Sequence, residues 1–200
     1  MKKAGTRKAQ DVGFAVSLWE AALLLPEPLA AKLRTVARAN DIPASEDVAP
    51  QLKSPNLWSG GYGGAGGQIV GPANLLVLRY GQTKPERYRE RILAVADLHL
   101  SNPVNLDFPL HPVIFGKVIY LMLNAHELTG DARYLDRADD LARKAVELFL
   151  PDGCPLPKAT HMHDHYEAVT NGDSLMMSLL QLWAAHQNPP RKLPLIYTDR

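Results

Sequence analysis

Residues 128–137 read Leu-Thr-Gly-Asp-Ala-Arg-Tyr-Leu-Asp-Arg, and residues 82–91 are a second copy of this stretch, Gln-Thr-Lys-Pro-Glu-Arg-Tyr-Arg-Glu-Arg. Thr83 matches Thr129 and Tyr88 matches Tyr134, and in each case the two residues are 46 positions apart. A repeat of this length is typical of a supersecondary unit that stacks on copies of itself, most often a pair of helices. The sequence therefore predicts an array of helical hairpins.

The helical segments are of two kinds. Some are apolar on nearly every side, which predicts inner helices that are buried all round, and these are residues 72–82, 113–127 and 172–187. Others carry charges on one face only, which predicts outer helices that face water, and these are residues 86–99 and 132–149. Residues 12–25 and 28–39 are expected to form a further pair, because Pro26 and Pro28 separate them. We see no strand pattern and predict an all-α fold of two layers, a single domain over residues 1–200.

Composition excludes several classes of partner. The chain has 22 Lys and Arg against 21 Asp and Glu, so nothing favours binding to nucleic acid. We expect no membrane span, because no apolar run reaches the ~20 residues that one needs. The basic residues 1–10 are expected to form a flexible tail. The oligomeric state is left open by the sequence.

Cysteine usage and the N-terminus bear on location. Cys154 is the only cysteine, so an intrachain disulfide is impossible, which fits a reducing compartment. Residues 14–25 are apolar, but no small-residue cleavage site follows them. The chain as written predicts a cytoplasmic protein, and an extracytoplasmic one if an N-terminal portion is missing.

The turn at Thr129-Gly130-Asp131, followed by Tyr134-Leu135, resembles the hairpin turn of the six-hairpin, or (α/α)6-toroid, carbohydrate-active proteins. The resemblance covers residues 72–187. It implies a two-layer (α/α) toroid that binds a glycan or oligosaccharide at its rim. Polysaccharide lyase, glycosidase and sugar-epimerase activities all remain open. Because 200 residues supply only about four hairpins of this period, we expect an incomplete barrel.

Long connections lead into the three inner segments, and parallel hairpins would place all three on one rim. They are residues 54–71, 101–112 and 151–172. Long loops that gather on one face of a repeat array are where function usually lies.

The last connection contains Thr-His-Met-His-Asp-His-Tyr-Glu at residues 160–167. The lyases resembled here use His and Tyr to remove a proton beside a uronate carboxylate, and both side chains suit acid–base chemistry. We therefore predict catalytic roles for His163, Tyr166 and His165, with Glu167 in substrate binding. His111, directly before the middle inner segment, is a further catalytic candidate. Two alternatives remain: a divalent metal site at His161, His163 and His165, or polar side chains that hold the loop and cap a helix starting near residues 170–173.

The glycine-rich residues 60–67 contain Gly-x-Gly-x-x-Gly, but they lack both a preceding strand and the Gly-Lys-Ser/Thr of a phosphate loop. We instead expect the glycines to let the backbone approach a ligand. Trp58 and Tyr62 would then offer flat faces to a sugar, with Gln68 and Asp107 as hydrogen-bonding residues. The alternative is a structural turn with the aromatic side chains packed inward.

Two other functions stay open. Residues 60–68 also resemble the Gly-Gly-x-Gly-Gly turns of terpenoid cyclases and protein prenyltransferases, in which case Asp152, Cys154, His161 and His163 would imitate a zinc site. Alternatively, the chain is a non-catalytic helical-repeat fragment.

Overall fold

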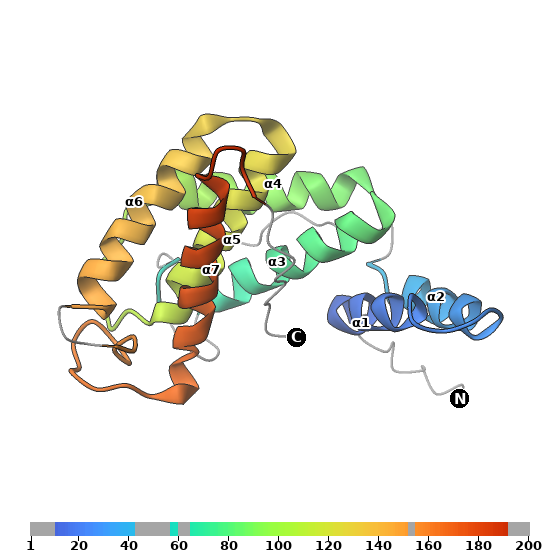
Figure 1. Ribbon diagram of the computed structural model, residues 1–200, viewed down its shortest axis with the longest axis horizontal. Coiled ribbons are helices and arrows are strands. Elements are labelled where there is room, and N and C mark those ends of the chain that lie inside the picture. Colours follow the sequence, from blue (N-terminus) through green and yellow to red (C-terminus); the bar gives the residue numbers. More distant parts are fainter. Residues whose placement is uncertain (1–10, 43–56, 60–64, 152–154, 192–200) are drawn as a thin grey trace, which may run out of the picture.

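The computed structural model describes residues 11–42, 57–59, 65–151 and 155–191, and within these ranges the fold is all-helical (Figure 1). The elements are α1 (Val12–Ala22), α2 (Leu29–Ala39), α3 (Ala65–Thr83), α4 (Glu86–Ser101), α5 (Pro112–Thr129), α6 (Ala132–Phe149), the 3-10 helix η1 (Ala168–Thr170) and α7 (Gly172–Ala185). The predicted all-α class is thus confirmed. The proposed tail and Tyr62 lie outside the described residues.

The helices form two layers, as the hairpin repeat predicts. Packing contacts run from α1 to α3, from α3 to α5 and from α5 to α7, which makes these four helices one row. In the second layer α4 packs on α3 and α6 packs on α5, with α4 and α6 in contact. The ends of the row, α1 and α7, lie far apart (Figure 1), so the described helices form an open row and not a closed ring.

The two copies of the repeat fold into equivalent turns. Gly130 follows α5 with a left-handed φ of 72°, and Lys84, 46 residues earlier, follows α3 with a φ of 56°. The hydroxyl of Thr129 donates to the Ala125 carbonyl at 2.7 Å, and that of Thr83 makes the same bond one turn back in α3 at 3.0 Å. Glycine adopts this conformation at no steric cost, whereas lysine does so under strain.

Equivalent tyrosines join each outer helix to the preceding one. Tyr134 in α6 is buried, and its hydroxyl donates to Asp97 of α4 at 2.6 Å. Its counterpart Tyr88 in α4 is also buried, and its hydroxyl accepts the Ile42 N–H at 3.1 Å, just after α2. The tyrosine at this repeat position therefore bonds each outer helix to the segment before it.

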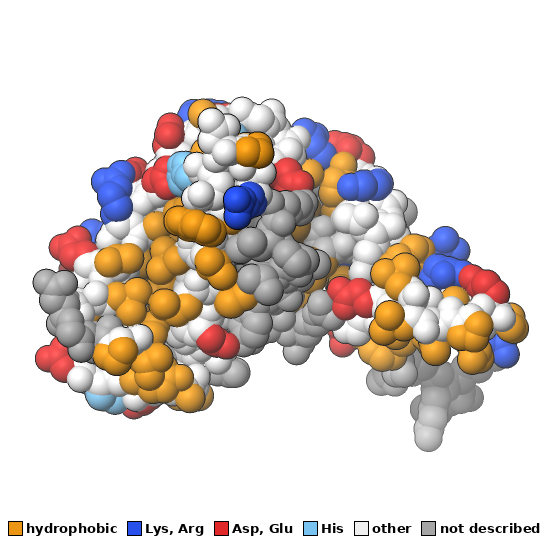
Figure 2. Space-filling view, viewed as in Figure 1, with side chains coloured by type: hydrophobic (Ala, Val, Ile, Leu, Met, Phe, Trp, Pro, Cys, Tyr) orange, Lys and Arg blue, Asp and Glu red, His pale blue; other side chains and the backbone are white. Residues whose placement is uncertain are grey.

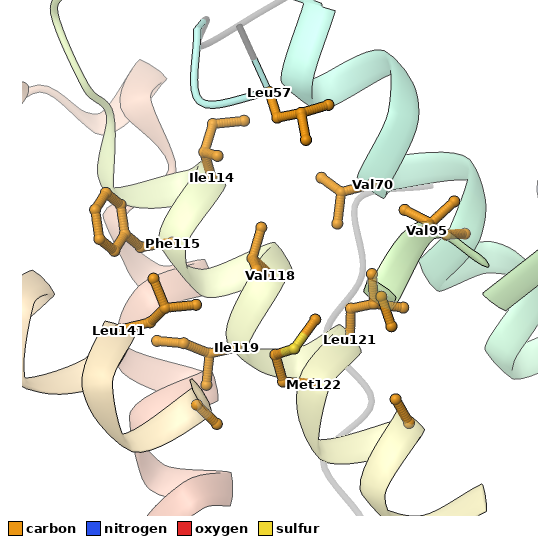
Figure 3. Packing of buried hydrophobic residues seen from close by; sticks show 14 of the residues in the cluster. Leu57, Val70, Val95, Ile114, Phe115, Val118, Ile119, Leu121, Met122 and Leu141 are labelled. Atoms are coloured by element: carbon orange, nitrogen blue, oxygen red, sulfur yellow. The ribbon is translucent and has the colours of Figure 1, made fainter. Parts of the chain in front are cut away.

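The core surrounds α5, which is buried along most of its length, as predicted for an inner helix. Figure 3 shows Phe115 on the side of α6, near Leu141, while Leu121 lies on the side of Val70 and Val95 from α3 and α4. The amphipathic prediction for residues 132–149 is also confirmed, because α6 buries a single face. Packing of this kind places the starts of α5 and α7 side by side.

Two sequence predictions are corrected. The first inner helix begins at Ala65 and not at residue 72, with Pro72 inside it. Pro72 is exposed on the surface of this helix. The last inner helix is not buried all round: Met176, Leu180 and Trp183 on α7 are exposed, because α7 ends the described row.

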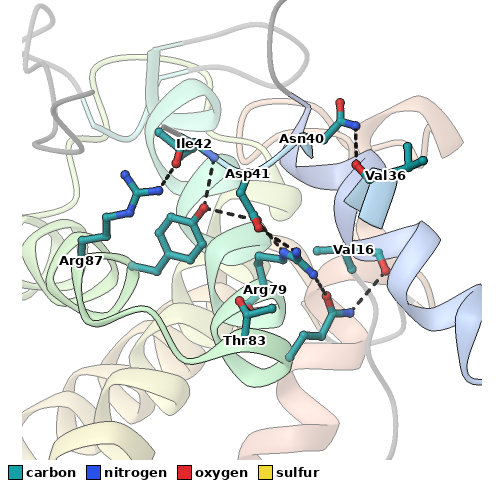
Figure 4. Close-up of polar contacts among 10 residues, drawn as sticks. Val16, Val36, Asn40, Asp41, Ile42, Arg79, Thr83 and Arg87 are labelled. Atoms are coloured by element: carbon teal, nitrogen blue, oxygen red, sulfur yellow. Dashed lines mark hydrogen bonds and ion pairs between the residues drawn. The ribbon is translucent and has the colours of Figure 1, made fainter. Parts of the chain in front are cut away.

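The α1–α2 pair projects from the end of α3, and a polar network holds it there (Figure 4). The fully buried Arg79 of α3 donates to both carboxylate oxygens of Asp41, at 2.6 and 2.8 Å. Arg79 also donates to Gln82, whose amide donates to the Val16 carbonyl of α1. The guanidinium of Arg79 thereby links both helices of the pair to α3.

His99 is a buried histidine in the last turn of α4. Its ring lies edge-on to Trp58 at 5.4 Å, and neither ring nitrogen has a hydrogen-bond partner within the described residues. Burial, followed by the charge of Arg137, lowers the pKa of His99 from 6.5 to about 4. The native state therefore holds this imidazole in its neutral form.

We predict that acid destabilises the protein through His99. The unfolded chain binds this proton below pH 6.5 and the native state only below about 4, so the free energy of unfolding should fall as the pH is lowered between these values. The loss is about 1.4 kcal/mol per pH unit for one group. Urea unfolding across this range should show a shallower dependence for His99→Leu. The exposed His186→Leu is the matched control, and an unchanged slope in His99→Leu would contradict the prediction.

Candidate functional site

The connections into α5 and α7 meet at one rim. The Leu110 N–H donates to Nδ1 of His161 at 3.1 Å, and the His161 N–H donates back to the Leu110 carbonyl at 3.3 Å. Leu110 itself is buried. Since Nδ1 accepts a hydrogen bond, His161 acts as a structural clamp between two loops that are 51 residues apart.

Local hydrogen bonds close residues 158–167 into a compact turn. The Ala159 N–H donates to the His165 carbonyl at 2.7 Å, and the Thr160 hydroxyl is hydrogen-bonded to Nδ1 of His163 at 2.6 Å. Lys158 forms an ion pair with Asp164. The turn brings the rings of His163 and His165 to 5.8 Å, one edge-on to the other.

A histidine–carboxylate pair lies on the exposed side of this turn. Nε2 of His165 is 2.7 Å from Oε1 of Glu167, and about half of each side chain is exposed. Tyr166, between them in the sequence, is 47% exposed. The predicted residues of this loop are therefore open to a ligand and are not packed into the core.

His111 joins the same cluster from the other loop. It is the N-cap residue of α5, and Nδ1 of its ring is buried without a hydrogen-bond partner among the described residues. Burial lowers the pKa of His111; the Ala159 backbone and the charge of Glu167 act in the opposite direction, while His163 adds to the lowering. Leu110, the residue before His111, is hydrogen-bonded to His161, so the fold brings His111 to the same rim as the turn. At neutral pH the His111 ring is uncharged and suited to accept a proton.

The other predicted binding residues in the described ranges differ in exposure. Trp58 is corrected: it is 1% exposed and packs against His99 and Phe115, so it offers no face to a sugar. The inward-packed alternative holds for this residue. Gln68 is exposed in the first turns of α3. Asp107 is exposed in the loop before α5, and its backbone N–H donates to the side-chain oxygen of Asn105.

The alternatives for the histidine-rich loop can be compared with the geometry. Within the described ranges, no group of three or more His, Cys, Asp and Glu is placed to hold a metal ion. Asp152 and Cys154 of the zinc hypothesis lie outside those ranges. In the remaining alternative, capping does not hold, because α7 starts at Gly172 after Asn171, whose side chain makes no capping bond, and η1 separates the helix from the turn. The polar side chains do hold the loop, through the bonds of His161 and His163.

Sequence reasoning missed the residues that shape the turn. Lys158 and Thr160 tie the start of the turn to Asp164 and His163. Their only signal in the sequence was their position beside the histidine run. The clamp from His161 to Leu110 had no signal at all, because it depends on how the two loops pack.

Comparison of the chain with family models, with curated proteins and with solved structures finds no match. None of the helices among the described residues is long and apolar enough to span a membrane. The sequence and the structure themselves are therefore the guide to function.

Proposed function

We propose that this protein is a carbohydrate-active domain that binds a glycan at the rim and moves a proton on it. The observation that carries the proposal is the meeting of His111 with the exposed turn at residues 163–167, from two distant loops. The hairpin repeat supports the same reading through its resemblance to toroid proteins. The bound segment would lie against His163, Tyr166 and Glu167.

The composition of the cluster favours proton transfer at a sugar carbon over hydrolysis. Hydrolysis uses two carboxylates on either side of the glycosidic bond. Here Asp164 is engaged by Lys158, which leaves Glu167 beside several imidazoles. A uronate is the fitting substrate class, because its carboxylate acidifies the adjacent C–H bond.

In the lyase version, His111 or His163 takes the proton from that carbon. The C–H electron pair forms a C=C bond, the glycosidic C–O bond breaks, and the leaving oxygen takes a proton from Tyr166. The Glu167 carboxylate would orient the His165 ring through their hydrogen bond. In an epimerase version, a second imidazole would return the proton to the opposite face of the same carbon.

The test is a screen of uronate-containing polysaccharides for the ultraviolet absorbance of the new C=C bond, and for epimerised product by NMR. We expect His163→Ala and Tyr166→Phe each to lower kcat about 10²-fold or more, because each removes a proton-transfer group. His186→Ala is the matched control, since His186 forms an equally exposed carboxylate pair, with Asp139, at the opposite end of α7. Full activity in both rim variants would remove this loop from the mechanism.

A binding measurement makes the test independent of turnover. Ring NMR should show His111 titrating below its usual range, and Glu167→Gln should lower its pKa further, because the carboxylate raises it. A bound uronate oligosaccharide should raise the pKa of His111 by adding negative charge beside it. A titration that no glycan alters would contradict the proposed site.

A non-catalytic helical-repeat module is the second candidate. The exposed apolar side chains of α7 favour it, because such a face suits contact with another macromolecule. Glycan binding at the rim would count against this candidate as the sole function.

A further inference from the structure

One face of α7 is apolar and exposed. Met176, Leu180 and Trp183 follow one another at helical spacing and are 42%, 41% and 54% exposed. Val169, just before the helix, is 61% exposed. Figure 2 shows hydrophobic side chains gathered over α7 and its surroundings on this side of the molecule. We call Met176, Leu180 and Trp183 the α7 face.

In the repeat, the equivalent face of the preceding inner helix packs against the helix that follows it. Ala125-His126 near the end of α5 corresponds to Ala185-His186 at the end of α7, which places Gly116 of α5 at the position of Met176. Gly116 is where α5 meets the next helix: its carbonyl accepts the Ser178 hydroxyl at 2.8 Å. Met176 therefore holds the position through which α5 contacts its successor.

The same comparison extends to α3. Asn74 corresponds to Tyr120 of α5 and Leu180 of α7. Asn74 is buried, and its amide donates to the Lys117 carbonyl of α5 at 3.0 Å. Tyr120 is buried as well, whereas Leu180 is not. The α7 face thus continues an established series of helix–helix interfaces and is its one uncovered member among the described helices.

Charge at the two ends of α7 indicates the direction of a partner helix. The helix contains no Lys or Arg, and its one charged residue, Asp173, is exposed in the first turn. At the other end, Arg191 is exposed and is held near the helix by its N–H bond to the Ala184 carbonyl at 2.9 Å. An antiparallel copy of the same helix would bring Asp173 beside Arg191, and opposed helix dipoles would add to the attraction.

We infer that the α7 face is the interface of a homodimer, in which α7 packs antiparallel against α7 of a second copy. A two-fold axis midway between Asp173 and Arg191 places Leu180 and Trp183 of both copies near the centre of the contact, which is then self-complementary. Leu, Met and Trp side chains at its centre, with charges at its rim, match the usual composition of such interfaces.

The first experiment measures molar mass by light scattering and sedimentation over a range of concentrations. We expect twice the 22.0 kDa of one chain. Leu180→Glu and Trp183→Glu should each weaken dimerisation about thirtyfold or more, the size typical of a central interface residue. Leu24→Glu is the matched control, because Leu24 is 86% exposed next to α1 and far from α7. Circular dichroism checks that each variant keeps its helices.

A charge exchange tests the direction of the packing. Asp173→Arg and Arg191→Asp should each weaken the dimer, because each places like charges together, and the double variant should restore it. A dimer that survives Leu180→Glu, or a double variant no tighter than the single ones, would overturn the antiparallel arrangement. A monomeric wild-type protein would overturn the inference itself.

Discussion

Asp41→Asn is expected to lower the free energy of unfolding by about 3 kcal/mol, the low end of the cost of removing one partner from a buried ion pair. Arg79 has no exposed side-chain surface, and Asp41 supplies both of the carboxylate oxygens that its guanidinium contacts (Figure 4). The substitution leaves a buried cation without a counter-charge. Because the same network fixes α1 and α2 to α3, we also expect the pair to detach at lower urea concentration than the rest. Urea unfolding followed by hydrogen exchange measures both effects.

Asp140→Asn provides the matched control. Asp140 forms an ion pair with Arg143, and both side chains are more than half exposed, so the loss should be no more than about 0.5 kcal/mol. The variant Asp41→Asn/Arg79→Met should recover part of the stability, because it removes the unpaired charge together with its partner. Equal losses in Asp41→Asn and Asp140→Asn would show that burial of Arg79 does not govern the energy.

Gly116→Ala should also destabilise the protein by about 3 kcal/mol, the upper end of the range for overpacking. A Cβ atom at this position would lie 2.6 Å from the carbonyl carbon and oxygen of Ser174. These are backbone atoms, so α5 and α7 must separate to make room. Chemical denaturation of the two proteins measures the difference.

Gly81→Ala is the control with the opposite expected sign. Gly81 is also helical, but no atom lies within 4 Å of its added Cβ. Alanine in an open helical position should stabilise by about 0.5–1 kcal/mol, since it restricts the unfolded chain. A destabilisation of similar size at both sites would mean that the close approach at Gly116 is not the cause.

Local structure was readable from the sequence wherever neighbours along the chain supply the interactions. The Thr-Gly-Asp turn follows from the left-handed residue at Gly130 and the side chain of Asp131, which accepts the Arg133 N–H at 3.0 Å. Its match to residues 83–88 predicted the hairpin array. The charged and apolar faces of residues 132–149 likewise predicted an outer helix, because helical spacing alone decides which side chains share a face.

The candidate site was predictable as a set of residues and not as an arrangement. The polar run at residues 160–167 indicated where to look. That His111 lies beside it depends on the clamp between Leu110 and His161, for which no spacing in the chain is diagnostic. The fate of Trp58 was equally undecided, because an indole suits both a sugar platform and a core, and only the positions of His99 and Phe115 settle the choice.

The sequence by itself thus determined the all-helical class, the hairpin turns and the order of the layers, although not the start of α3. Those features rest on interactions within a few residues, which the pattern of side chains specifies. Only the tertiary structure decided that Arg79 is buried, that two loops share a rim, and that α7 keeps an apolar face uncovered. These outcomes depend on which surfaces meet across long separations in the chain. An apolar helix face predicts that a partner packs on it, but the sequence of the helix does not identify that partner.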